Sequence, residues 1–125
     1  MKKYMTIQEK KTSLLIAFCT LSGGVLGNAS TKDLKNLIEI GLLLGRIFQT
    51  QDDILDLEGT EKEMGKKVNK DQKLNKATII RLKDISYAKK EVQDLCIDAK
   101  KKLDLIKKDT LHLSYLIDFL GYRTN

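Results

Sequence analysis

The sequence predicts an all-α protein built as a helical bundle, and three observations support this prediction. Its 125 residues include no proline and no tryptophan, and leucine, isoleucine and lysine dominate. This composition favours helices. Apolar residues recur at helical spacing over several long segments, and no segment shows the alternation typical of a β-strand. The length corresponds to one domain or part of one.

The first helix is expected at about residues 7–22. Thr6 and Glu9 form a capping-box pattern, in which each side chain pairs with a free amide at a helix start. The pair Gly23-Gly24 is a plausible stop. The body of this segment is apolar on most sides, which predicts that the helix is almost completely buried.

The second helix is expected to begin at Ser30 or Thr31, either of which can cap it. Gly41 and Gly45 lie one turn apart on this helix, and each would weaken an isolated helix by about 1 kcal/mol. Two glycines on one face predict that the backbone of a neighbouring helix packs closely there. Gly59 is the expected end.

The rest of the chain is predicted to hold a polar loop and three further helices. The segment 59–76 is rich in lysine and is expected to be a loop. A short helix follows at about 77–83, and a last helix at about 111–122. Between them, a long amphipathic helix opens at Ser86 and carries one apolar stripe. This stripe comprises Ala88, Val92, Leu95, Ala99, Leu103 and Ile106.

An acid motif lies in the second helix. Asp52 and Asp56 are one turn apart on one face, with Asp53 and Gln49 beside them. No lysine or arginine lies between Ile47 and Leu57. With Gly59 as the stop, the acids would lie near the helix C-terminus, where the macrodipole disfavours negative charge. A cation is therefore expected to complete the cluster, and oxygen ligands suit Mg²⁺. The alternative is a solvated acidic face.

Charge and cysteine usage narrow the class of protein. The net charge is +6, but the basic residues are scattered among acids, and the few aromatic residues do not form a base-stacking platform. We therefore expect no nucleic-acid partner. Cys19 and Cys96 fit no metal-ligand or redox spacing, which indicates a reducing cytoplasm. His112 is the single histidine and has no partner with which to form a site.

The N-terminal segment superficially resembles a secretion signal, with lysines before an apolar run at 13–21. Glu9 lies within the supposed basic region, however, and the run is shorter than the ~20 residues of a membrane span. We expect a cytoplasmic protein without a membrane span. A small secreted basic helical protein remains the weaker alternative.

Three elements in order resemble one known family. These are Lys11-Thr12 early in a helix, then Gly45-x-x-Phe48-Gln49-x-x-Asp52-Asp53-Ile54-Leu55-Asp56, and then Gly65-Lys66 with Asp71-Gln72-x-Leu74-x-Lys76-x-Thr78. Their order and spacing resemble the C-terminal half of the trans-isoprenyl diphosphate synthases, or polyprenyl synthetases. Within that family, the sequence resembles the bacterial farnesyl diphosphate synthases in particular. The resemblance covers nearly the whole chain.

The resemblance implies a fold and a set of site residues. The fold would be the C-terminal half of the isoprenoid synthase bundle, in which two aspartate-rich motifs face each other across a cavity and hold Mg²⁺ on a substrate diphosphate. It implies three roles: metal binding by Asp52, Asp53 and Asp56; diphosphate binding by Lys11, Lys66 and Lys76; and contact with the transient carbocation by oxygens near Thr12 and Gln49, with Lys11 in the same catalytic group.

The implied reaction is head-to-tail condensation of isopentenyl diphosphate with an allylic diphosphate. The family usually needs about twice this length, and this chain holds one Asp-Asp-x-x-Asp motif. Residues 1–125 are therefore expected to form a single incomplete domain that lacks an N-terminal half and is inactive alone. A separately encoded half, a gene remnant and a truncated sequence all stay open. The expected partner is an N-terminal half polypeptide or a second copy; the alternative function is a non-catalytic helical partner of a prenyl synthase.

Overall fold

The computed structural model describes Thr6 and residues 9–64 and 84–124, and within these residues every regular element is a helix. This confirms the predicted all-α class. The elements are a π-helical turn η1 (Glu9–Ser13) and the α-helices α2 (Leu14–Leu26), α3 (Thr31–Met64), α5 (Ile85–Leu103) and α6 (Leu111–Tyr122). None of the described helices is long and apolar enough to cross a membrane. The short helix expected at 77–83 lies outside the described residues.

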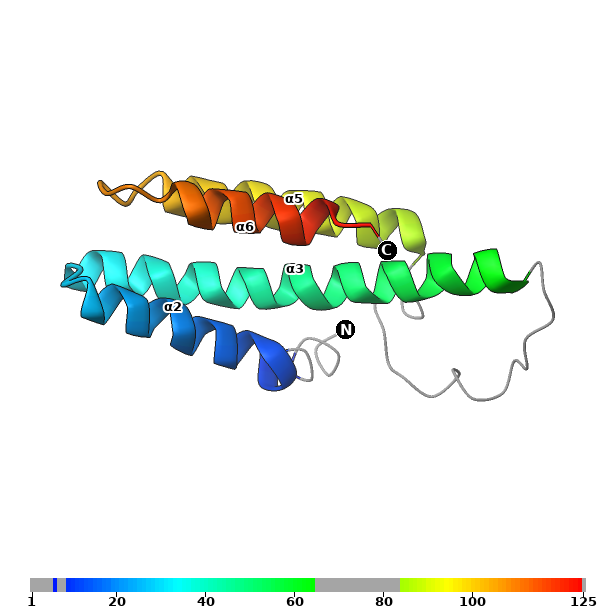
Figure 1. Cartoon of the computed structure of the whole chain (residues 1–125), viewed down its shortest axis with the longest axis horizontal. Coiled ribbons are helices and arrows are strands. Elements are labelled where there is room, and N and C mark those ends of the chain that lie inside the picture. Colours follow the sequence, from blue (N-terminus) through cyan, green and yellow to red (C-terminus); the bar gives the residue numbers. More distant parts are fainter. Residues whose placement is uncertain (1–5, 7–8, 65–83, 125) are drawn as a thin grey trace.

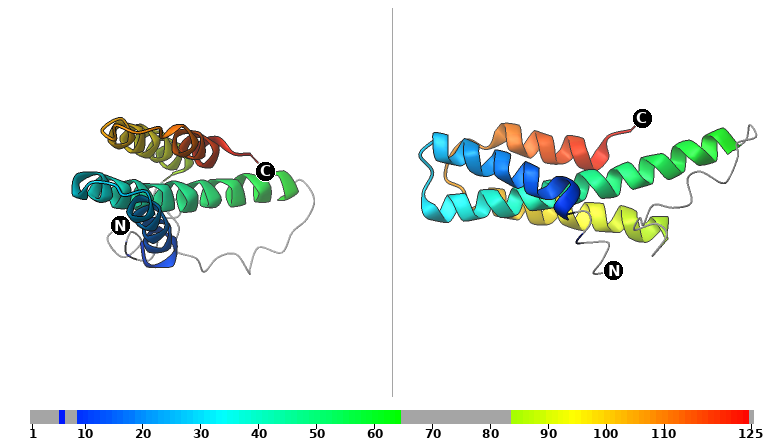
Figure 2. Two further views of the ribbon diagram at one scale, coloured as in Figure 1. Left: turned by 60° about the vertical axis from the view of Figure 1, so that its left-hand side comes forward. Right: turned by 90° about the horizontal axis from the view of Figure 1, so that it is seen from below.

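The long helix α3 is the centre of the bundle. It packs against each of the other described elements. The helix α2 lies along one side of α3, and α5 and α6 lie next to each other on the opposite side (Figure 1). The two further views show the same arrangement, with the last turns of α3 extending past the end of α6 (Figure 2). Both η1 and the end of α6 lie near the middle of α3, because Ser13 of η1 packs against Gly45 and Arg123, which follows α6, binds Asp52.

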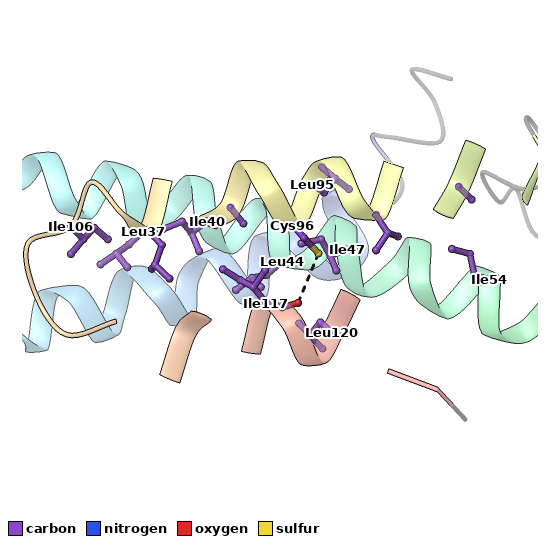
Figure 3. Close-up of a cluster of buried hydrophobic side chains, with 14 residues drawn as sticks. Leu37, Ile40, Leu44, Ile47, Ile54, Leu95, Cys96, Ile106, Ile117 and Leu120 are labelled. Atoms are coloured by element: carbon purple, nitrogen blue, oxygen red, sulfur yellow. Dashed lines mark hydrogen bonds between the residues drawn. The ribbon is translucent and has the colours of Figure 1, made fainter. Parts of the chain in front are cut away.

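The hydrophobic core lies between α3, α5 and α6 (Figure 3). All six residues of the apolar stripe expected on and just after α5 are buried, which confirms that prediction. The Cys96 thiol contributes to this core and donates a hydrogen bond to the Ile117 carbonyl at 3.9 Å (Figure 3). The side chains that α3 contributes are Leu37, Ile40, Leu44, Ile47 and Ile54.

The two glycines of α3 face the backbone of the first helical segment, as predicted. A Cβ atom at Gly41 would collide with the Cα of Ala17, and one at Gly45 would collide with the Cα of Ser13. The helices therefore approach so closely that no larger residue fits at either position. This contact sets the position of η1 relative to the middle of α3.

The expected end of the first helix at Gly23-Gly24 is wrong, because α2 continues to Leu26. Gly24 lies against α3, and a Cβ there would meet the side chains of Leu34 and Leu37. It is therefore a packing glycine. The helix ends instead in a Schellman motif, in which Asn28 adopts a φ of 54° and the amide of Ala29 bonds to the Gly24 carbonyl at 2.9 Å.

The expected end of the second helix at Gly59 is also wrong. Ser30 does cap the start, because its Oγ accepts the Asp33 amide at 3.1 Å, but α3 continues through Gly59 to Met64. The strong helix formers on both sides of this glycine offset its cost of about 1 kcal/mol. The acids therefore end about two turns before the helix C-terminus, and the macrodipole does not act on them as expected.

The prediction that the first helix is almost completely buried is wrong within the described residues. Ala17 is buried, but Leu15 and Phe18 expose 68% and 64% of their surfaces. The reason is that α2 packs mainly on α3, while α5 and α6 cover the other side of α3. The outer face of α2 therefore has no cover within the described part of the chain.

Candidate functional site

The acid motif lies on one side of α3, past the centre of the helix. Asp52 and Asp53 are half-buried, and Asp56, one turn after Asp52, is exposed. Gln49 belongs to the same side and is almost fully buried, at 6% exposure. The helical repeat thus brings the four predicted residues of α3 to one face, as the spacing indicated.

Gln49 is joined to the N-terminal segment by a hydrogen bond. The Thr12 hydroxyl donates to Gln49 Oε1 at 3.1 Å, across 37 positions of sequence. Thr12 lies in the π-helical turn η1, and π-turns inside helices occur frequently at functional sites. The structure therefore brings together two of the three residues expected to act in catalysis. Lys11 belongs to the same turn, but its side chain lies outside what the structure describes.

Arg123, the residue that follows α6, also contacts the acid motif. Its Nη2 donates to Asp52 Oδ1 at 3.0 Å, and the guanidinium carbon lies 4.7 Å from the centre of the Phe48 ring. Its backbone carbonyl accepts a hydrogen bond from Gln51 Nε2 at 3.1 Å. A cation supplied by the protein therefore pairs with one of the three acids.

Sequence analysis missed Arg123. The signal was present in part, because no lysine or arginine lies between Ile47 and Leu57 and a cation was expected to complete the acid motif. The partner comes from a position 71 residues further along the chain. Only the packing of α6 against α3 brings it there.

Asp52, Asp53 and Asp56 are the described residues that could hold Mg²⁺ together with a phosphate ligand. Among the described residues, no three His, Cys, Asp or Glu side chains converge closely enough to hold a metal ion by themselves. Mg²⁺ is usually bound through one or two carboxylates plus substrate phosphates, so a closed cage of three is not needed. Lys66 and Lys76, the other residues expected to bind the diphosphate, lie outside the described residues.

An apolar groove runs between α2, α3 and the segment that leads into α6. Its volume is about 760 Å³. Ile16 and Thr20 of α2 form one wall, Leu113 and Leu116 of α6 form the other, and Leu37 and Leu44 are among the lining residues of α3. The groove is lined by residues from the first half of α3, and the acid motif lies further along the same helix.

The helices and the residues around the acid motif define an all-α protein with a carboxylate-bearing central helix. The chain belongs to the polyprenyl synthetase family, whose sequence profile matches residues 1–112. This confirms the resemblance that the Lys-Thr pair, the acid motif and the following basic segment indicated.

Individual relatives agree with this membership. The chain is 35% identical over 109 residues to the farnesyl diphosphate synthase of Bacillus subtilis, which covers 86% of this chain and 37% of that protein. It is 38% identical over 104 residues to the farnesyl diphosphate synthase of Haemophilus influenzae, with 82% and 35% covered. A geranylgeranyl diphosphate synthase of Saccharolobus solfataricus is 30% identical over 125 residues, with 91% and 38% covered. The chain thus spans less than two-fifths of the length of these relatives.

Proposed function

We propose that this chain is the C-terminal portion of a prenyltransferase that condenses isopentenyl diphosphate with an allylic diphosphate, head to tail, in the cytoplasm. Its relatives are farnesyl and geranylgeranyl diphosphate synthases. The single observation that carries the proposal is the shared face of α3, where the acid motif lies beside a Gln49 side chain held by Thr12.

The reaction requires that negative charge on the departing diphosphate be stabilised as the allylic carbon becomes a cation. Bound Mg²⁺ would supply positive charge to that leaving group. On this chain, Asp52, Asp53 and Asp56 would hold the metal ions, and Lys11, Lys66 and Lys76 would bind the remaining phosphate oxygens.

Thr12 and Gln49 have a different role in the proposal. Their hydrogen bond fixes two side-chain oxygens, one on the buried Gln49 and one on the half-buried Thr12. Fixed oxygen dipoles favour a positive charge that develops nearby and need no reorganisation as it forms. These oxygens would therefore face the allylic cation, while the lysines face the diphosphate.

The chain is proposed to act with an N-terminal half polypeptide. The groove along α2 and α6 and the exposed apolar face of α2 would lie against that partner, because large uncovered apolar surfaces usually mark an interface. Charge must be met from both sides of the substrate diphosphate, so we expect residues 1–125 alone to be inactive in condensation.

The metal role of the acids is tested by calorimetry with the full chain, Mg²⁺ and inorganic pyrophosphate. Asp52→Ala removes a charged ligand worth about 1.5–3 kcal/mol, so pyrophosphate should bind roughly tenfold to a hundredfold more weakly. Asp94→Ala, an exposed aspartate on α5, is the matched control and should bind as the wild type does. Unchanged Mg²⁺-dependent binding by Asp52→Ala would contradict the proposal.

The second candidate function is a non-catalytic helical partner of an active prenyl synthase. The exposed apolar face of α2 favours it, because such a face is required for binding whether or not chemistry occurs. The two functions differ in one experiment. When the chain is mixed with an N-terminal half, Mg²⁺ and both substrates, the enzyme role predicts product that is lost in Asp52→Ala. The partner role predicts a complex that forms without this dependence.

A further inference from the structure

Arg123 is held against α3 by three separate contacts within one turn of that helix. The guanidinium pairs with Asp52, the same group lies over the Phe48 ring, and the backbone carbonyl accepts from Gln51. The residue also ends α6, where its amide bonds to the Phe119 carbonyl at 3.0 Å. Arg123 thus connects the end of α6 to the acid motif.

This ion pair differs from an ordinary surface pair. Exposed pairs contribute little, because two long side chains lose freedom to form one bond. Here the Arg123 side chain is 22% exposed and is already fixed by the aromatic ring and by its backbone, whereas Asp52 is 46% exposed. The Arg123 side chain is therefore already ordered by its other contacts, and the ion pair mainly restricts the position of Asp52.

The pair leaves Asp52 in a defined orientation. Arg123 binds Oδ1, and this fixes the direction of the second carboxylate oxygen, Oδ2. Mg²⁺ requires nearly ideal octahedral geometry. Partners that orient a metal-binding carboxylate commonly change metal affinity by roughly 10–100-fold.

We propose that Arg123 is a positioning residue of the acid motif, which orients Asp52 for a Mg²⁺–diphosphate ligand and makes that orientation depend on the docking of α6. This inference rests on the proposed function, because it takes Asp52 to be a metal ligand. Arg123 acts through Asp52 and is not itself assigned a contact with substrate.

Arg123 could instead weaken Mg²⁺ binding, by competing with the metal ion for Asp52. A guanidinium on Asp52 also repels a second cation and occupies one carboxylate oxygen. If this competition outweighed the orienting effect, removal of Arg123 would strengthen Mg²⁺-dependent binding. The direction of the change therefore distinguishes a positioning residue from a blocking one.

The test measures binding of inorganic pyrophosphate in the presence of Mg²⁺ by calorimetry, with the full 125-residue chain. Arg123→Gln should weaken binding by about tenfold. Arg123→Lys keeps the charge but loses the planar guanidinium and its stacking on the ring. Its affinity for pyrophosphate should therefore lie between those of the wild type and Arg123→Gln. Lys100→Gln is the matched control, because it breaks another ion pair of α6, with Asp118 at 2.7 Å, and should leave binding unchanged.

A double-mutant cycle separates positioning from direct contact. In an Asp52→Asn background, Arg123→Gln should cause little further loss, because the residue it acts through has already changed. Unchanged or tighter binding by Arg123→Gln would overturn the proposal. So would a tenfold loss that persists in the Asp52→Asn background, since Arg123 would then contact the ligand itself.

A ligand-free measurement keeps this inference distinct from the proposed function. If the wild-type chain fails to bind Mg²⁺ and pyrophosphate, the proposed metal role of Asp52 falls, and the positioning of a metal ligand falls with it. Thermal unfolding of the wild type, Asp52→Asn, Arg123→Gln and the double variant then shows whether Arg123 holds Asp52 at all. Non-additive decreases in Tm confirm the coupling while the function fails. Additive decreases reject the coupling itself, whatever the binding result.

Discussion

The Cys96 thiol is buried where α5 meets α6, and this burial raises its pKa from 9.0 to about 11, with a further contribution from the nearby Asp118 carboxylate. The protonated thiol also donates to the Ile117 carbonyl. Both effects favour the neutral form in the folded protein. Cys96 is therefore a structural thiol, in contrast to the exposed Cys19.

The raised pKa of Cys96 predicts a pH dependence of stability. The folded protein binds the thiol proton more tightly than the unfolded chain, so the contribution is complete below about pH 9 and is lost as the pH rises toward 11. The loss should be on the order of 2 kcal/mol. Urea unfolding of the wild type and of Cys96→Ala from pH 8 to 11 gives the free energy of unfolding of each protein against pH. The loss is the difference between the two pH dependences.

A thiol reagent at pH 8 provides the control for this prediction. The folded chain should react quickly at the exposed Cys19 and slowly at the buried Cys96. Rapid reaction at both thiols, or the same pH slope in both proteins, would show that the α5–α6 contact does not protect Cys96.

At the scale of the elements, Gly45 decides how η1 meets α3. A Cβ at this position would collide with the backbone and side chain of Ser13, next to Thr12. Backbone cannot move aside as a flexible side chain can. The position of η1 on α3 and the Thr12–Gln49 hydrogen bond therefore both depend on Gly45.

We expect Gly45→Ala to destabilise the protein by about 1–3 kcal/mol, as overpacking does, although alanine alone would favour the helix. Gly23→Ala is the matched control, because its Cβ would meet nothing within 4 Å. That change should raise stability by up to about 1 kcal/mol. Urea unfolding of the two variants measures both effects, and a neutral Gly45→Ala would contradict the close approach.

Local signals predicted the parts of the fold that depend on one segment at a time. The stripe on α5 and the bounds of α6 follow from spacing that the segment itself carries. The cap at Ser30 depends only on its neighbour Asp33. The roles of the glycines were predicted less accurately, because a glycine can either end a helix or allow a neighbouring helix to pack closely. Gly24 and Gly59 were both read as stops, and both lie within helices.

The sequence predicted the part of the candidate site that helical spacing determines. It did not predict the contacts that tertiary packing brings about. Asp52 and Gln49 share a face of α3 because of the helical repeat. The partners of these residues, Arg123 and Thr12, reach them from distant positions in the sequence. The family resemblance implied that oxygens near Thr12 and Gln49 face the same carbocation, but it did not predict their hydrogen bond, and the sequence around the acids did not point to Arg123.

At the scale of the whole molecule, several apolar side chains of α2 and α6 are uncovered within the described part of the chain. They include Leu14, Leu15 and Phe18 of α2 and Tyr115, Phe119 and Tyr122 of α6. Leu116 of α6, which is also exposed, lines the groove between those helices. Isolated exposed apolar residues are normal, but contiguous apolar patches of several hundred Å² mark interaction surfaces.

We therefore expect the chain to self-associate or to co-purify with a partner. Sedimentation velocity should show a mean mass that rises with concentration, because association removes the apolar faces of α2 and α6 from water. Phe18→Asp places a charge within the exposed face of α2 and should shift the population toward monomer. Ile97→Asp is the matched control, since Ile97 is 52% exposed on α5 and lies apart from the groove. A wild type that remains monomeric at all concentrations and purifies alone would show that these faces need no cover, and the proposed N-terminal partner would lose its docking surface.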